Sequence, residues 1–333
     1  GIAVDRFGNA YITGDIPADE PFQTTDGSTH HGGIDTFVIK LSFDGVSTVT
    51  IAYSTLIGGS GLDQALGIAV DQGEDIYLGG VTESADFPTL HPYQATYAGN
   101  SDGFVVELDP NGVPLYSTYF GGSGFDGIIG VAIGNASGTG NQCVAPCDVY
   151  VTGDTTSTDF PSASPLQPNH ANCITQAFVA RLQLPAGLPF STTIGGCNGE
   201  AIGDAVAVTT AGEIVLAGLT TGSLPLVHPI QGTYAGGNSD AFVLKIGANP
   251  TAAVVSRFTT QRIAGRMLFT WRLIARTDVL SFDLYAGTHR LNAHTIPVHA
   301  SPVYHYRVGA VTHGRYTLHT LLRNGQQIVV AVG

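Results

Sequence analysis

One unit recurs four times along most of this chain. Its copies begin at Gly1, Gly67, Gly130 and Ala205, at spacings of 66, 63 and 75 residues, and open with GIAVD, GIAVD, GVAIG and AVAVT. Repetition at such a period constrains the fold strongly, because every copy must adopt the same local structure and bury its apolar surface against its neighbours.

The second copy, residues 67–130, shows what one unit contains. Four runs rich in β-branched and aromatic residues cover 67–70, 75–81, 103–108 and 115–120, with Gly, Pro, Asn, Asp and Ser between them. A four-stranded unit at this period is typical of a propeller blade. We therefore predict an all-β fold, with a β-propeller of four-stranded blades over residues 1–253. The fourth copy lacks its last strand-like run, so the ring has four blades, has further blades, or receives a strand from another segment or chain.

The pattern changes after Pro250. Strand-like runs cover 266–273, 280–285, 303–311, 316–322 and 326–332, and Asn324-Gly325 is a strong hairpin signal. About 80 residues with strands at this spacing predict a small immunoglobulin- or fibronectin-like β-sandwich over residues 254–333.

Two resemblances follow from these motifs. The pattern GIAVDxxGNxYxTG, a DFP loop, DAFVxKL and YSTYxGGSGxD resembles the bacterial SBBP β-propeller repeat, which implies a large secreted or cell-surface protein and, by its name, seven blades. Residues 266–298, with Trp271 and the run 277–285, resemble a fibronectin type III-like module of bacterial surface proteins. There Arg276 replaces the usual acidic residue.

Charge is unevenly distributed between the two segments. Residues 1–253 carry 24 acidic and four basic side chains, a net charge of −20, whereas residues 254–333 carry nine Arg and two Asp, a net charge of +7. This asymmetry predicts docking of one segment on the other, within a chain or between chains, or else two independently solvated surfaces. The acidic segment disfavours nucleic acid, and no apolar run is long enough to span a bilayer.

All four cysteines lie in the third copy. Their even number and clustering favour disulfides in an oxidising compartment over a zinc site. Cys143 and Cys147 would close a short loop in an insertion of about ten residues. Cys173 and Cys197 would close the open end of a hairpin that turns near residues 185–187, at a separation suited to a disulfide.

Recurring carboxylates favour structural roles over catalysis. Asp5 and Asp71 recur at one position, Asp35, Asp102 and Asp240 at another, and Asp63, Asp126 and Asp204 at a third. Catalysis needs one site with distinct environments, so we interpret these residues as hydrogen-bonding groups at turns and strand ends. No calcium-loop ladder or HExxH spacing is present in the sequence, and we expect no cofactor, although structural calcium in these loops is an alternative.

The loops that contain DFP, and the related loop 224–234, are candidate ligand loops. Their aromatic and histidine side chains could stack on a sugar or another ligand: Phe87, His91, Tyr93, Tyr97, Phe160, His228 and Tyr234. Asn135-Ala136-Ser137 is a glycosylation sequon.

Together these patterns predict a non-catalytic, secreted or cell-surface protein with a structural or adhesive role. We expect head-to-tail association of acidic propeller and basic sandwich, into a filament or surface layer. A carbohydrate- or ligand-binding module is the alternative. A polysaccharide-cleaving enzyme is the weaker third hypothesis, because nothing places two of the unrepeated carboxylates together: Asp19, Glu20, Glu83, Glu107 and Glu200.

Overall fold

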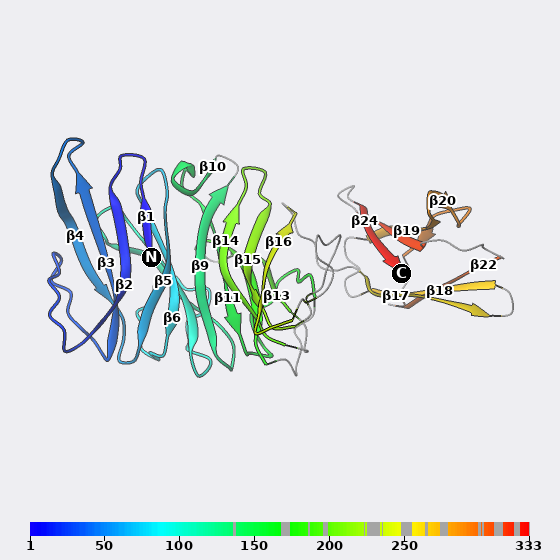
Figure 1. Cartoon of the computed structure of the whole chain (residues 1–333), viewed down its shortest axis with the longest axis horizontal. Helices are drawn as coiled ribbons and strands as arrows, with labels where there is room; N and C mark the ends of the chain where they lie inside the picture. The colour runs from blue at the N-terminus through cyan, green and yellow to red at the C-terminus, as the bar shows by residue number, and fades with distance from the viewer. Residues whose placement is uncertain are drawn as a thin grey trace. The chain divides into compact units, whose positions relative to one another are not determined.

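The chain forms two compact units, Gly1–Pro250 and Thr251–Gly333, in a computed structural model (Figure 1). The structure describes residues 1–135, 138–167, 174–185, 187–195, 199–222, 224, 234, 236–247, 255–263, 266–273, 279–298, 301, 303–309, 316–322 and 327–332. Over these residues the fold is all-β, with one short 3-10 helix, η1 (Gly140–Gln142).

The first unit contains four antiparallel sheets, one for each sequence copy. The first sheet has the order β1 (Ile2–Val4), β2 (Ala10–Pro17), β3 (Ile34–Phe43) and β4 (Val49–Ile57). The second has β5 (Asp63–Val70), β6 (Ile76–Thr82), β7 (Asp102–Leu108) and β8 (Pro114–Phe120). The third has β10 (Gly138–Thr139), β9 (Asp126–Asn135), β11 (Asp148–Thr155), β12 (Gln176–Gln183) and β13 (Gly187–Ile194). The fourth has β14 (Ala201–Val208), β15 (Ile214–Thr220) and β16 (Asp240–Ile246).

The first strands of the second, third and fourth sheets begin four residues before the repeat starts read from the sequence, at Asp63, Asp126 and Ala201. The pairing of each first strand with the next strand shifts register part-way along. The shift lies between Ala65 and Gly67 in β5, which pairs with β6, and between Gly203 and Ala205 in β14, which pairs with β15. The shift interrupts the alternation of side chains, which is why the sequence pattern indicated only the second part of each strand.

Successive sheets pack face to face. We call the face of a sheet that packs on the preceding sheet its front face, and the opposite face its back face. Tyr11, Val38 and Tyr53 on the back face of the first sheet share one core with Leu78 and Val106 on the front face of the second. Two further cores lie between the second and third sheets and between the third and fourth. The strands β1, β5, β9 and β14, each the first strand of its sheet in the sequence, contact one another in chain order; we call them the inner strands (Figure 1).

The second unit contains two sheets that share one buried cluster. The first consists of β17 (Val255–Ile263), β18 (Arg266–Leu273) and β22 (Val303–Val308). The other consists of β20 (His289–Arg290), β19 (Val279–Ala286), β23 (Tyr316–Leu322) and β24 (Gln327–Val332), with β21 (Ile296–Pro297) paired to β19. Trp271 and Tyr304 from the first sheet and Phe282 and Leu318 from the other form the centre of the cluster. The predicted runs 266–273 and 316–322 coincide with β18 and β23, whereas β17 had no sequence prediction.

Candidate functional site

The connection between the first and second sheets is held by a compact set of polar contacts. Asp63 Oδ2 accepts hydrogen bonds from Gly59 N and from Ser84 Oγ, both at 2.7 Å, and Ser84 Oγ accepts one from Gly61 N at 2.8 Å. Asp86 Oδ1 accepts from the amide and the hydroxyl of Ser60, at 2.8 and 2.9 Å. We call this arrangement the connection clamp, because it ties the GGSG loop to the next sheet.

The connection between the second and third sheets has the same clamp. Asp126 Oδ2 accepts from Gly122 N and Ser157 Oγ, both at 2.7 Å, and Asp159 Oδ1 accepts from the amide and hydroxyl of Ser123. Gly124 N donates to Ser157 Oγ at 2.7 Å. Because the same contacts are built twice, they belong to the repeat rather than to a single site.

Electrostatics within the clamps follow the burial of each carboxyl group. Burial raises the pKa of Asp63 and of Asp126, whose side chains are inaccessible to solvent. The exposed Asp86 and Asp159 have lowered pKa values, because each accepts hydrogen bonds from a serine amide and hydroxyl. As predicted, the buried carboxylates act as acceptors at turns and strand ends.

The third connection departs from this pattern. Ala201 pairs with Thr220 as Asp63 pairs with Thr82, so Ala201 occupies the aspartate position. Gly222 and Leu224 then replace the clamp serine and the outer aspartate. The sequence alignment of Asp204 with Asp63 and Asp126 was wrong, because Asp204 lies three residues after Ala201, at the register shift between Gly203 and Ala205, where the second sheet has Leu66.

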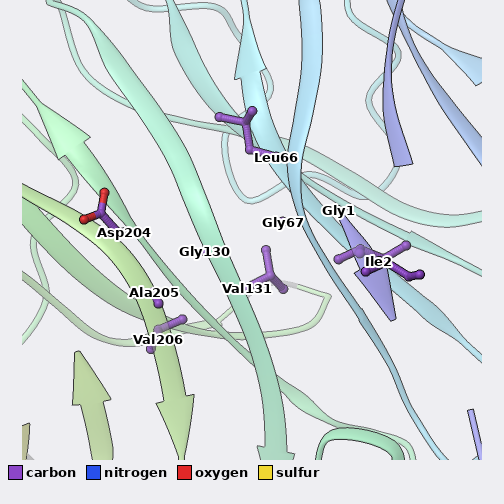
Figure 2. A pocket seen from close by; sticks show the side chains of 10 residues that line it. Gly1, Ile2, Leu66, Gly67, Gly130, Val131, Asp204, Ala205 and Val206 are labelled. Atoms are coloured by element: carbon purple, nitrogen blue, oxygen red, sulfur yellow. The ribbon is translucent and has the colours of Figure 1, made fainter. Parts of the chain in front are cut away.

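A pocket of about 220 Å³ lies along the inner strands, and Figure 2 shows its lining. The lining residues come from β1, β5, β9 and β14: Gly1, Ile2, Leu66, Gly67, Ile68, Gly130, Val131, Asp204, Ala205 and Val206. Asp204 is the one titratable side chain among them. A Cβ on Gly67 would lie 2.9 Å from Val131 N, so glycine permits the close approach of β5 and β9. With one carboxylate and an apolar wall, the pocket has no acid–base pair.

The phenylalanines of the candidate ligand loops are core residues. Phe87 packs on Phe104 with ring centroids 4.7 Å apart, and Phe160 packs on Phe178 at 4.6 Å. Both loop rings are buried, so neither presents a face to a ligand.

The other loop residues divide into anchored and exposed side chains. The hydroxyl of Tyr97 donates to the carbonyl of Asn100, and that of Tyr234 donates to the carbonyl of Gly237. Tyr93 is 40% exposed and His91 is exposed, so these two are open to a ligand. His228 lies outside the described residues.

The two DFP loops run along the edge of the last strand in their own sheets, β8 and β13. Leu90 and Ser117 exchange both backbone hydrogen bonds, and Tyr119 N donates to the carbonyl of Gln94. Ser117 Oγ donates to the carbonyl of Pro88, and the equivalent Ser191 donates to that of Pro161. A covered edge cannot pair with another chain. The loops therefore have a structural role that the sequence alone did not indicate.

Several carboxylates outside the clamps also have raised pKa values. Burial and neighbouring aspartates raise the pKa of Asp75, Asp102 and Asp154 to about 6. Asp102 Oδ2 still accepts from Ala98 N and Gln94 Nε2, both at 2.9 Å. Within the described part of the chain, no group of three His, Cys, Asp or Glu side chains is placed to hold a metal ion.

The insertion in the third copy carries a disulfide between Cys143 and Cys147. Both half-cystines are buried in the core between the second and third sheets, and Gln72 N donates to the carbonyl of Cys143 at 2.8 Å. Cys173 and Cys197 lie outside the described residues. The β12–β13 hairpin lies between these two cysteines in the sequence, and its register shifts between Arg181, which pairs with Phe190, and Gln183, which pairs with Gly187.

Asn135 lies at the end of β9 and its side chain holds the insertion. Its Nδ2 donates to the carbonyls of Val144 and Pro146, at 2.7 and 2.8 Å. A glycan on this nitrogen would remove at least one of the two hydrogen bonds.

Sequence comparison identifies one segment. Residues 1–18 match the SBBP beta-propeller repeat family. The match covers β1 and β2 of the first sheet. Comparison with curated proteins finds no match to the chain. No helix in the described ranges has the length and apolar character required to cross a bilayer.

Proposed function

We propose that the protein is a non-catalytic, extracellular structural or adhesive protein, in which SBBP-type propeller blades precede a fibronectin type III-like sandwich. One observation carries this proposal: the buried carboxylates and serines of the connection clamps are used in contacts between sheets. Asp63, Ser84, Asp126 and Ser157 are buried and bonded to one another or to loop amides. A buried carboxylate engaged in this way is unavailable to a substrate.

Charge supplies the proposed mode of assembly. The acidic residues of one protomer and the arginines of another attract each other, and a contact between different surfaces repeats head to tail. Arg266 in β18 and Arg307 in β22 are exposed and belong to the same sheet. They are therefore suitable positions for a test.

Sedimentation velocity of the full chain at two salt concentrations tests this assembly. The Debye length is about 30 Å at 0.01 M salt and about 3 Å at 1 M. We expect larger species at low salt than at high salt, and loss of these species in the Arg266→Glu/Arg307→Glu variant. The matched Arg266→Lys/Arg307→Lys variant retains the charge and should assemble normally. Identical distributions at both salt concentrations would contradict the proposal.

Exposure of Tyr93 and His91 supports a second candidate function, the binding of a carbohydrate. An exposed aromatic ring beside a histidine offers a stacking surface and a hydrogen-bonding group. A glycan array with the wild-type chain and with Tyr93→Ala tests this candidate. Val46→Ala, at an exposed position elsewhere, is the control. Binding that survives Tyr93→Ala would exclude the loop as the site.

A further inference from the structure

A pair of buried aspartates lies beside the first glycine of the GGSG loop between the second and third sheets. A Cβ placed on Gly121 would lie 2.8 Å from Asp102 Oδ1 and 2.9 Å from Asp126 Oδ2, so these two oxygens are no farther apart than the two distances combined. Both aspartates are 0% exposed. Two carboxylates this close and shielded from water repel each other, which favours a proton on one of them.

Hydrogen bonds occupy one oxygen of each carboxyl group. Asp126 Oδ2 is an acceptor in the connection clamp. Asp102 Oδ2 accepts from Ala98 N and Gln94 Nε2. Asp102 Oδ1 is buried and accepts no hydrogen bond from any residue that the structure describes. A proton on this oxygen would turn an unpartnered acceptor into a donor for the neighbouring carboxylate.

The charge of this pair is not balanced by an ion pair. Among the described residues, no Lys, Arg or His forms an ion pair with either aspartate. Burial and the charge of Asp126 raise the pKa of Asp102 to about 6, and burial raises the pKa of Asp126. Further titratable side chains that interact with the pair are acids or tyrosines: Tyr97, Tyr119, Asp154 and Asp159. A bound proton is the group that can reduce the negative charge here.

The connection between the first and second sheets repeats the pair with one addition. A Cβ on Gly58 would touch Asp35 Oδ1 and lie 2.9 Å from Asp63 Oδ2. His30 Nδ1 lies 3.2 Å from Asp35 Oδ2, and a protonated imidazole there balances one of the charges. The first pair can therefore be neutralised by a histidine, whereas the second depends on a proton of its own.

The connection between the third and fourth sheets lacks both carboxyl groups. Gln176 occupies the position of Asp102 in the strand pairing. Ala201 occupies that of Asp126. Gly195 lies beside both, since a Cβ there would lie 3.5 Å from Ala201 Cβ and 3.8 Å from Gln176 Cγ. The two aspartates are present together or replaced together by neutral residues, which indicates that they function as a pair.

We propose that Asp102 and Asp126 hold one proton between them and form a pH-sensitive contact in the connection between the second and third sheets. With the proton bound, the pair carries one charge and Asp102 Oδ1 acts as a donor. Loss of the proton as the pH rises leaves two buried charges, so the connection is weaker above the folded-state pKa than below it. Because Gln94 also bonds to Asp102, the contact links the DFP loop of the second sheet to the clamp of the third. This contact goes beyond the structural role proposed above and does not depend on assembly of the chain.

NMR of the full chain, isotopically labelled at the aspartate carboxyl carbons, measures the proton directly. The pH is varied between about 4 and about 8 at about 1 M salt, where the charge-driven assembly proposed above is screened and a buried pair is not. We expect one carboxyl group of the pair to titrate at about pH 6, well above the ordinary value of about 3.9. Titration of both carboxyl groups at or below the ordinary value would overturn the proposal, whatever the result of the assembly experiment.

The Asp126→Asn variant distinguishes a pair from an aspartate that is merely buried. Asparagine keeps a carbonyl acceptor for the clamp but removes the charge beside Asp102. The titration of Asp102 should therefore move to lower pH by at least about one pH unit. Asp86→Asn, at an exposed position of the other clamp, is the matched control and should leave the titration of Asp102 unchanged. If Asp102 still titrates at about pH 6 in Asp126→Asn, burial alone raises its pKa and the shared proton is excluded.

Discussion

Replacement of Ser84 by alanine tests whether the connection clamp stabilises the fold. Ser84 Oγ is buried, donates to Asp63 Oδ2 and accepts from Gly61 N. An amide left without an acceptor costs about 1–3 kcal/mol, and a lost hydrogen bond to a charged group costs about 1.5–3 kcal/mol. Partial relaxation of the loop reduces the sum, so we expect a loss of about 3 kcal/mol in the free energy of unfolding at pH 7.5. In a unit of this size the midpoint of thermal unfolding should fall by about 6–12 °C.

The pH dependence of this loss identifies Asp63 as the affected group. Burial raises the folded-state pKa of Asp63, and the Ser84 hydrogen bond opposes this effect. In Ser84→Ala the folded-state pKa should therefore rise further. A raised folded-state pKa stabilises the protein at low pH, and this contribution is lost as the pH rises through that pKa. The difference between variant and wild type should be largest near neutral pH and should shrink as the pH falls.

Calorimetry or denaturant unfolding of both proteins at several pH values measures this difference. Ser60→Ala is the matched control in the same clamp. Ser60 is exposed and its amide still donates to Asp86, so we expect little change. If Ser84→Ala unfolds like the wild type at every pH, the clamp does not stabilise the connection and the reasoning is wrong.

Three further predictions concern other parts of the first unit. Gly153→Ala should lower the free energy of unfolding by at least about 3 kcal/mol, because the new Cβ would lie 1.8 Å from Gly127 O. The control is Gly247→Ala, where a Cβ would meet no atom within 4 Å, and it should change the free energy of unfolding by less than about 0.5 kcal/mol. Equal losses for the two variants in denaturant unfolding would contradict the prediction. The Cys143→Ser/Cys147→Ser variant should have a free energy of unfolding about 2 kcal/mol lower than the wild type, because the short loop is no longer closed in the unfolded chain. Denaturant unfolding measures this difference, and unchanged stability would show that the buried contacts alone hold the insertion. The midpoint of thermal unfolding should be higher at pH 5 than at pH 7.5, because the folded-state pKa values of Asp75, Asp102 and Asp154 are raised to about 6. A higher midpoint at pH 7.5 would contradict this direction of the pH dependence.

Strand positions in the first unit were predictable because alternation and turn residues are local signals. The run 115–120 and strand β8 differ by one residue, and the run 103–108 and strand β7 also differ by one. Contacts between strands distant in sequence have no such local signal.

The clamp and the edge-covering loops were missed for this reason. A signal for the clamp was present: GGSG at 58–61 and at 121–124 is each followed in the next copy by S-x-D-F-P, at 84–88 and 157–161, and both motifs are lost together at Cys197 and Gly222. Co-variation between copies therefore indicates a contact between the two motifs. The burial of Phe87 and Phe160 had no comparable signal, because an aromatic residue in a loop can face solvent or the core.

The uneven distribution of the clamps has a consequence for the order of unfolding. In a linear array each sheet depends on the coupling to its neighbours, so the weakest coupling determines where cooperative unfolding begins. The clamp joins the first three sheets but is replaced at the third connection by Ala201, Gly222 and Leu224. The fourth sheet should therefore open before the others, as a separate unit with the fastest amide hydrogen exchange in the array. Unfolding of the first unit then has a direction, from its C-terminal sheet towards its N-terminal sheet.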